Sequence, residues 1–434
     1  MTESPSPATP KPRLRIACIL LWYPLFTQPF LFRELEAVRE HVDLAVYTLY
    51  GKNLAHCSEE MRNLPHPVHT HGLASVPKVL LALGQALLRH PIRFGTLFAK
   101  HLFRSWPNLE VFGENLWAFC VSFLLSKELQ ANPVDLIYAP WPRGTAQTAW
   151  MLTTLLRIPY VMTVRGDNLN PADPDLEDKM TAALAIRTNN GADVKRIEDF
   201  GKGQAKGKTH LVYNCLTLPQ TTPPPPHILA KEHPLRLMAL GRFDVTKGFD
   251  VLLFACKELL DRGMAFHLTL AGGGGIAFGL GGLEGRLKEL VHTLGLKDVV
   301  SFPGLLSHQE LPAIFASHDI FCSPNVIDNS GRRDGIPNTL IEAMSAGLPV
   351  VASAIHALPE LVKHQETGLL VPQKDPKALA DAIAWMDSHP EEAARLGQNG
   401  ARFVQKRFDT TSNAKALATL FHHVLAAKDT VCAR

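Results

Sequence analysis

The stretch LRLMALGRFDVTKG, residues 235–248, is the part of the chain that decides the fold. Leu235–Leu240 is a mostly apolar run, and a polar turn with a glycine at each end, Gly241–Gly248, follows it directly. This pattern predicts a buried strand that ends in a loop. The loop carries Arg242 and Lys247, which suit a diphosphate because a guanidinium can grip two oxygens and an ammonium adds a point charge.

A second stretch, DGIPNTLIEAMSAGLPVVA at residues 334–352, predicts a loop, a helix and another buried strand. Asp334 lies in the loop before the helix, and Glu342 lies within the helix among apolar residues, where an unpaired charge is costly. The start of the helix near Asn338 offers free N–H groups to an anion. Two carboxylates at this spacing can accept hydrogen bonds from sugar hydroxyls while the amides hold phosphate.

The same alternation of apolar strand and amphipathic helix runs through both halves of the chain. It predicts strands at residues 14–21, 43–49, 135–138, 159–164, 210–213, 235–240, 266–271, 299–302, 320–323 and 349–352. Continuous apolar strands that alternate with helices indicate parallel sheets covered on both faces. We therefore predict an α/β protein with two doubly wound Rossmann-like domains whose ligand lies in a cleft at the carboxyl ends of the strands.

The boundaries follow from composition. Residues 1–13 are rich in Pro, Ser and Thr and predict a disordered tail, and the Pro-rich stretch TLPQTTPPPPHI, residues 217–228, predicts a semi-rigid linker. These segments separate an N-terminal domain at 14–216 from a C-terminal domain at 229–410. A final helix is predicted over 411–434.

Composition narrows the class of protein. The chain has 434 residues, 46% of them apolar, which excludes a disordered or fibrous protein. Its 44 Lys+Arg against 41 Asp+Glu leave a formal charge of +3, too weak to indicate nucleic-acid binding. Seven scattered cysteines without a CxxC pair fit a reducing compartment. The apolar run at 116–125 is shorter than the roughly 20 residues of a membrane span, so we expect a cytoplasmic protein.

The segment 61–109 differs from the rest of the chain in charge. It contains no Asp or Glu, and it combines six Lys or Arg residues with many Leu and Phe residues. Basic amphipathic helices are typical of contacts with an anionic membrane surface. A helical insertion that packs on the first domain with its basic face in water explains the pattern equally well. Both interpretations stay open, the first with the protein peripheral on the inner face of the plasma membrane.

Beyond these patterns, the chain resembles glycosyltransferase family 4, of the exopolysaccharide and surface-glycan type. The resemblance rests on GRFDVTKG, DGIPNTLIE and AMSAGLPVVAS in the second half and on YPLFTQPFLFRELEAV near the N-terminus. It implies a GT-B fold and retaining transfer of a hexose from a UDP- or GDP-linked sugar to a glycan or lipid-linked saccharide in polysaccharide synthesis. It also implies that neither a metal nor another cofactor is needed.

The resemblance also implies roles for single residues. Arg242 and Lys247 would neutralise the leaving diphosphate, Asp334 would bind hydroxyls of the donor sugar, and Glu342 would bind the ribose. The donor-binding set would add the residues Gly241, Gly304, Leu305, Asn338, Thr339 and Gln28. Arg165 stands where the family has a first-domain histidine, and Asp334 stands where the family usually has glutamate.

These departures keep two rival functions open. One is a catalytically inactive subunit that binds nucleotide sugars in a glycan assembly complex, and the other is a nucleotide-sugar epimerase of the same architecture. Two weaker signals favour neither rival. GGGGIAFG at 272–279 is spaced one residue too long for a dinucleotide fingerprint, and HPVHTH at 66–71 is interpreted as a solvated loop.

Overall fold

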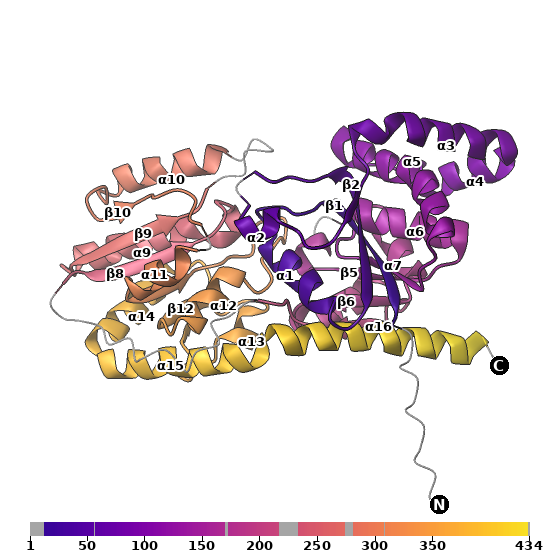
Figure 1. Cartoon of the computed structure of the whole chain (residues 1–434). Coiled ribbons are helices and arrows are strands. Elements are labelled where there is room, and N and C mark those ends of the chain that lie inside the picture. The colour runs from indigo at the N-terminus through magenta and orange to yellow at the C-terminus, as the bar shows by residue number, and fades with distance from the viewer. Residues whose placement is uncertain are drawn as a thin grey trace, which may run out of the picture.

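The computed structural model describes residues 13–432 except 56, 170–171, 217–232, 274–280 and 308, so the predicted tail and linker lie outside the described residues. The chain forms two separate parallel sheets, each with helices around it (Figure 1). This architecture confirms the predicted α/β fold class with two doubly wound sheets.

The first sheet has seven strands in the order β3-β2-β1-β4-β5-β6-β7. Its strands are β1 Arg15–Trp22, β2 Asp43–Gly51, β3 Val68–Thr70, β4 Leu136–Ala139, β5 Tyr160–Thr163, β6 Ala185–Thr188 and β7 Thr209–Leu211. Its helices are α1 Pro29–Val38, α2 Glu59–Arg62, α3 Val76–Arg89, α4 Pro91–Leu102, α5 Leu109–Ala131, α6 Gly144–Leu156, α7 Leu176–Ala182 and α8 Ala192–Phe200. We call this part the first half.

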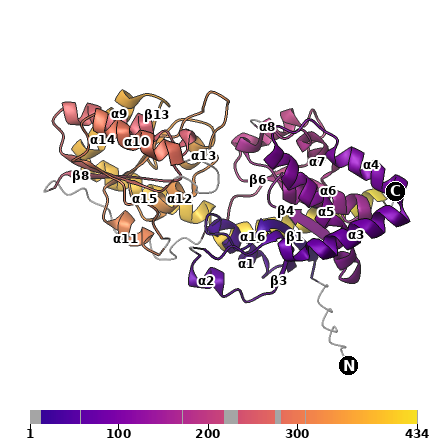
Figure 2. The ribbon, with the colours of Figure 1, turned by 90° about the horizontal axis from the view of Figure 1, so that it is seen from above.

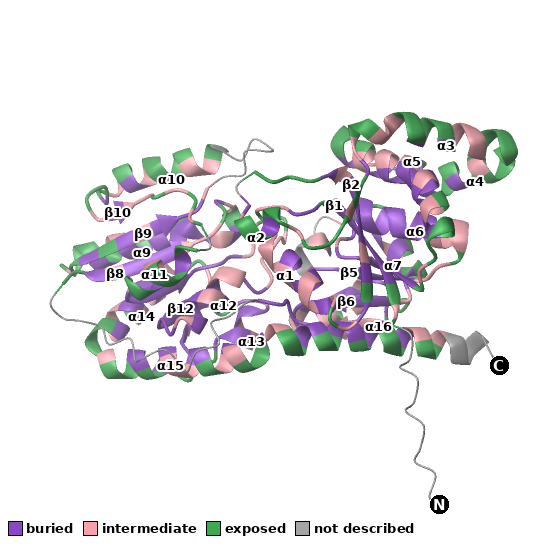
Figure 3. Ribbon diagram, in the orientation of Figure 1, coloured by how far each residue is buried: buried purple, intermediate pink, exposed green. Residues whose placement is uncertain are grey.

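The second sheet has six strands in the order β10-β9-β8-β11-β12-β13. Its strands are β8 Leu235–Leu240, β9 Phe266–Ala271, β10 Val300–Ser301, β11 Ile320–Ser323, β12 Val350–Ser353 and β13 Leu369–Val371. Its helices are α9 Phe249–Asp261, α10 Gly281–Thr293, α11 Leu311–Ala316, α12 Asn338–Ser345, α13 Leu358–Leu361, α14 Pro376–Ser388 and α15 Pro390–Arg407. We call this part the second half. The central strands of both sheets are buried (Figure 3).

The last helix, α16 Thr410–Cys432, returns from the second half to the first (Figures 1 and 2). Its apolar residues Ala414, Leu417 and Phe421 belong to the same core cluster as Leu31 and Leu35 of α1. The start of α16 is tied down by hydrogen bonds, since Thr410 Oγ1 donates to the Leu216 carbonyl at 2.6 Å. Helix α16 therefore links the second half to the first.

Three strands are absent from the prediction for identifiable reasons. β6 contains Arg187, a fully buried side chain that interrupts the apolar run. β3 and β13 have three residues each and lie at the edges of their sheets. The interpretation of HPVHTH as a solvated loop is correct only in part, since His66 and His69 are exposed but the segment contains a strand and a buried histidine. Val68–Thr70 pairs with β2, and His71 is 4% exposed with its Nε2 2.9 Å from Glu128 Oε1.

Helices α3 and α4 lie within residues 61–109, the predicted basic insertion, and α5 begins at the last residue of that segment. α5 has 23 residues, and by length and composition it is apolar enough to cross a membrane. In this fold α5 packs against α6 and α3, and its Phe119 and Phe123 share a core cluster with Leu97 of α4. Because one side of α5 is buried by these contacts, α5 is a core helix of the first half.

Candidate functional site

Three strand ends of the second half meet at glycines. The Gly272 N–H donates to the Gly304 carbonyl at 2.8 Å, and a Cβ on Gly272 would lie only 1.8 Å from the Gly241 carbonyl oxygen. Gly272 and Gly304 also have φ values of +130° and +83°, which other residues rarely adopt. The predicted residues Gly241 and Gly304 therefore come together where the backbone is most closely packed.

Lys247 follows in the loop after β8 and faces the predicted carboxylate. Its Nζ lies 2.5 Å from Asp334 Oδ2, and Asn325 Nδ2 donates to the same oxygen at 3.3 Å. Gly241 makes room for the lysine, because a Cβ at Gly241 would lie 3.1 Å from Lys247 Cε. The structure thus joins two residues that are 87 positions apart in the sequence.

Arg242 lies in the same loop with an exposed side chain. Among the described residues its guanidinium has no ion-pair or hydrogen-bond partner, although its charge helps to lower the pKa of Asp244. Burial raises the pKa of Asp244, but hydrogen bonds from Thr246 and the charges of Arg332 and Arg242 outweigh that effect. Asp244 itself holds the loop, since its Oδ1 accepts from the Thr246 N–H at 2.9 Å.

The start of α12 lies against the end of β8. Thr339 Oγ1 donates to the Leu240 carbonyl at 3.1 Å, so the first turn of α12 lies beside the Gly241 loop. The helix has Pro337 at its N-cap position and no side-chain cap. Within the described chain, no acceptor faces the backbone N–H groups of Asn338 and Thr339. This end of α12 can therefore accept an anion.

Glu342 lies on α12 at the junction with the first half. Burial raises the pKa of its carboxyl to about 7, and the charge of Arg33 on α1 opposes that rise. At neutral pH the side chain is therefore divided between its two protonation states. A ligand hydroxyl that donates to Glu342 would favour the ionised form.

Arg165 and Gln28 come from the first half. The Arg165 guanidinium lies over the Trp141 ring at 4.1 Å and donates from Nη1 to the Pro140 carbonyl at 2.9 Å. Phe30 lies on α1 at 5.7 Å from the same guanidinium, and Gln28 is the N-cap residue of α1. Arg165 is only 9% exposed, so it occupies a fixed position between aromatic rings. The contacts of Arg165 given above are all with residues of the first half.

Leu305 follows Gly304 at the outer end of this arrangement. Its side chain is 61% exposed and lies 3.5 Å from the place where a Cβ on Gly273 would stand. An exposed leucine beside bare glycine backbone offers an apolar contact to a flat group. This placement suits the expected place of Leu305 in the donor-binding set, as a contact for a flat group such as a nucleotide base.

The two halves contact each other directly beside these residues. A Cβ on Gly335 would lie 3.5 Å from Asn190 Nδ2, so the Asp334 loop abuts the residues that follow β6. Glu360 of α13 accepts hydrogen bonds from the Gly191 and Ala192 N–H groups at the start of α8, at 2.8 and 2.6 Å. The strand ends of both sheets therefore meet at one junction.

A buried pair reinforces the junction. His356 Nε2 lies 3.0 Å from Asp193 Oδ1, and both side chains are almost fully buried. Burial alone would raise the pKa of Asp193, but the hydrogen bond and charge of His356, with Asn190 and Arg196, hold it below its ordinary value. Sequence reasoning missed this pair, Arg33 and Glu360, because their partners are more than a hundred residues away in the sequence. It also missed Asn325, although its partner Asp334 is only nine positions away.

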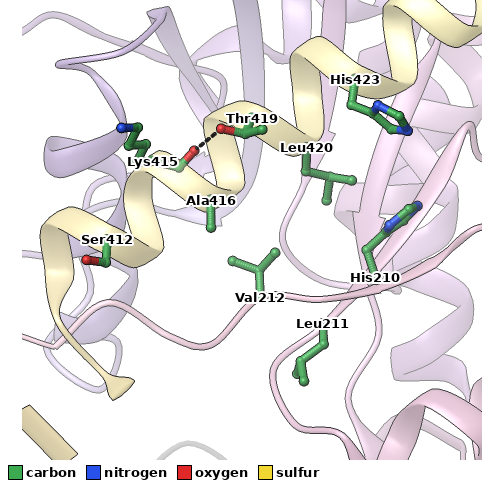
Figure 4. A pocket seen from close by; sticks show the side chains of 9 residues that line it. All are labelled: His210, Leu211, Val212, Ser412, Lys415, Ala416, Thr419, Leu420 and His423. Atoms are coloured by element: carbon green, nitrogen blue, oxygen red, sulfur yellow. Dashed lines mark hydrogen bonds between the residues drawn. The ribbon is translucent and has the colours of Figure 1, made fainter. Parts of the chain in front are cut away.

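A cavity in the described part of the chain lies away from these residues. It has a volume of about 470 Å³ and is lined by β7 and α16, with His210, His423 and Lys415 around it (Figure 4). None of the predicted site residues lines this cavity. In the described part of the chain, no three His, Cys, Asp or Glu side chains form a group that could hold a metal ion.

Comparison with known proteins agrees with this geometry. Residues 225–403 match the family model of glycosyl transferases group 1. The crystal structure of Anabaena HepE in complex with UDP and glucose superposes with a TM-score of 0.68 at 18% identity, and the match covers 94% of this chain and 99% of that one. The chain therefore has the GT-B fold.

Curated relatives match part of the chain. The putative colanic acid biosynthesis glycosyltransferase WcaL of Escherichia coli is 32% identical over 197 residues, which are 45% of this chain and 47% of the relative. A GDP-mannose-dependent phosphatidylinositol monomannoside mannosyltransferase of Mycobacterium tuberculosis is 33% identical over 177 residues, 40% of this chain and 44% of the relative. The chain thus spans less than half the length of each of these relatives.

Proposed function

We propose that the chain is a retaining glycosyltransferase that transfers a hexose from a UDP- or GDP-linked sugar to a glycan or lipid-linked acceptor in surface polysaccharide synthesis. The observation that carries this proposal is the Lys247–Asp334 pair beside the bare backbone of Gly241 and the uncapped start of α12. Cations, free N–H groups and a carboxylate within one loop cluster match the diphosphate and hydroxyls of a nucleotide sugar. HepE with UDP and glucose, and relatives named for polysaccharide synthesis, support the same assignment.

The ion pair suggests how the donor enters. Without ligand, Lys247 is neutralised by Asp334 at 2.5 Å. A donor diphosphate would bind Lys247 and Arg242, and Asp334 would then exchange the lysine for a hydroxyl of the sugar. Asp334 has one methylene fewer than glutamate, and its bond to Lys247 fixes where the shorter carboxylate stands. The pair therefore couples binding of the diphosphate to placement of the sugar.

The same groups account for bond cleavage. Negative charge develops on the diphosphate as the glycosidic bond breaks, and preorganised cations stabilise it most where water is excluded. We infer that the leaving diphosphate takes the proton of the incoming hydroxyl on the same face of the sugar. The acceptor would approach from the first half, past Arg165 and Gln28, on the cytoplasmic side of the membrane.

A donor panel tests the proposal. Purified protein is incubated with UDP- and GDP-hexoses without acceptor, and free sugar and nucleoside diphosphate are measured. We expect slow release of both from one donor, because water can replace the acceptor hydroxyl. Binding of a nucleotide sugar without any release, and without transfer to extracted lipid-linked saccharides, would instead indicate an inactive binding subunit.

A further inference from the structure

The surface of α3 and α4 exposes an unusual amount of apolar side chain. Sixteen large apolar residues of the described chain are exposed, and nine of them lie between residues 73 and 109. They are Leu73 (92% exposed), Leu80, Leu81, Leu87, Leu88 (83%), Ile92 (86%), Phe98, Phe103 (86%) and Leu109 (87%). Exposed apolar residues that are scattered singly need no explanation, but a concentration of this kind indicates a contact surface.

The exposed leucines of α3 are not required by the fold. Val79 and Ala82 form the buried face of α3, which packs towards Phe119 and Phe123 of α5. Leu80 with Leu87 and Leu81 with Leu88 are each seven residues apart, so they follow the other side of the helix. α3 is therefore apolar on two sides, and the structure covers only one of them (Figure 3).

The charged residues of the segment that carries this surface, residues 61–109, are all basic. Residues 61–109 contain no Asp or Glu, and Lys78, Arg89 and Arg93 are exposed. Among the described residues, none of these three has an ion-pair or hydrogen-bond partner through its side chain. The other basic residues of α4 are engaged in the fold, since Arg104 pairs with Asp178 at 2.7 Å and Lys100 Nζ lies 5.3 Å from the centroid of the Trp150 ring.

We propose that the α3–α4 surface docks on an anionic lipid bilayer. Exposed Leu and Ile beside unpaired Lys and Arg match acyl chains below anionic headgroups, whereas a protein partner of matching charge would need an acidic apolar face. α3 and α4 have 14 and 12 residues, about 21 and 18 Å of helix, and cannot cross a hydrocarbon core of about 30 Å. They lie in the plane of the interface, with the hairpin turn His90–Pro91 between Arg89 and Arg93 facing the lipid.

The proposal does not depend on the transferase activity, so a sedimentation assay without donor tests it. Full-length protein is mixed with vesicles of phosphatidylglycerol and phosphatidylcholine, or of phosphatidylcholine alone, at low and high salt. We expect the wild type to pellet with the anionic vesicles and to be partly released by salt, because screening weakens the electrostatic attraction. Absence of pelleting at low salt overturns the proposal.

Two variants separate the two contributions. Lys78→Glu/Arg89→Glu/Arg93→Glu should weaken partitioning by at least about a hundredfold, since each basic residue near the surface contributes about fivefold. Leu88→Ser/Ile92→Ser should weaken it by at least about tenfold even at high salt, where the apolar contribution remains.

Matched controls lie on the second half. Lys297→Glu/Lys377→Glu/Lys406→Glu makes the same change of charge at three exposed lysines, and Phe254→Ser/Leu260→Ser removes two exposed apolar residues from α9. Both controls should pellet like the wild type. Equal loss in a control, or a dimer of the wild type in solution that Leu88→Ser/Ile92→Ser dissociates, would assign the surface to something other than lipid.

Discussion

The two halves of the chain place charged residues in opposite ways. In the second half, Lys247 and Asp334 lie at strand ends, where a ligand can reach them. In the first half, Arg187 lies within a strand, fully buried, and its two Nη atoms lie 2.6 and 2.7 Å from the Glu34 carboxylate oxygens. Tyr138 completes that network by accepting from Arg187 at 2.7 Å. Under the proposed function, the Lys247–Asp334 pair of the second half binds a ligand, whereas the buried Arg187–Glu34 pair of the first half holds the fold together.

The buried network gives the largest expected effect. Arg187→Ala would leave Glu34 buried without its counter-charge, and removal of one partner from such a pair costs about 3–5 kcal/mol. We expect Arg187→Ala to unfold at a much lower denaturant concentration than the wild type or to accumulate in aggregates. Glu34→Gln/Arg187→Met, which removes both charges, should recover part of the loss. Unfolding of Arg187→Ala at the wild-type midpoint would show that this network is dispensable.

Lys247→Ala should lower turnover and leave stability unchanged, in contrast to Arg187→Ala. We expect turnover to fall by about a hundredfold or more, because the charge on the leaving diphosphate loses a partner. The unfolding midpoint should stay near that of the wild type, since Lys247 lies in a polar loop. Lys257→Ala is the matched control, because Lys257 also pairs with an aspartate, Asp261, but on exposed α9. Equal turnover of the two variants would remove Lys247 from the reaction.

The contrast also explains what sequence could and could not predict. In the second half, the sequence predicts most strands and the loops that carry the candidate site residues, because these residues follow apolar strands in short loops, such as Lys247 after β8. In the first half, the sequence does not predict those features that depend on contacts between residues far apart in the chain. Arg187 interrupts the apolar pattern of β6, so the strand is not recognised from the sequence. Arg165 packs against Trp141 and Phe30, and no sequence motif predicts that contact.

Glu342 connects the two halves and should make nucleotide binding depend on pH. The carboxyl of Glu342 has a raised pKa of about 7, so part of the protein carries it protonated near neutral pH. A ribose hydroxyl that donates to the carboxylate favours its ionised form, and nucleotide binding should therefore release a proton from Glu342. Calorimetric titration with a nucleotide sugar in buffers of different ionisation enthalpy measures how many protons are released on binding. The diphosphate of a nucleotide sugar does not titrate near pH 7, so it does not contribute to that number. Glu342→Gln should abolish proton release and weaken binding by roughly 10- to 100-fold.

The same shift sets the sign of an effect on stability. The folded pKa of Glu342 is raised, so its burial costs nothing below the ordinary carboxyl pKa and destabilises the fold as pH rises towards 7 and above. Glu342→Gln should therefore stabilise the unliganded protein at pH 8 by on the order of 2 kcal/mol and leave it unchanged at pH 4. A thermal melt with the same shift at both pH values would contradict this assignment.

The smallest effect concerns Asp334. Asp334→Asn frees Lys247 from its partner, so the free nucleoside diphosphate should bind about two- to fivefold more tightly, in line with a partly exposed ion pair. Transfer should nevertheless fall, because the amide no longer accepts from the sugar hydroxyls as a carboxylate does. Asp328→Asn is the control, since Asp328 pairs with Arg332 in the same loop region. Weaker binding of the nucleoside diphosphate by Asp334→Asn would argue against the proposal that Asp334 exchanges Lys247 for a sugar hydroxyl.

The most direct test of the account is a calorimetric titration of UDP and GDP into the wild type and Lys247→Ala. The account predicts that the wild type binds one of the two nucleotides at a single site per chain. It also predicts that Lys247→Ala, with an unchanged melting temperature, binds that nucleotide at least about tenfold more weakly, because a charge-assisted contact of about 1.5–3 kcal/mol is lost. Failure of the wild type to bind either nucleotide, or equal affinity of the folded variant, would contradict the placement of the donor site in the second half.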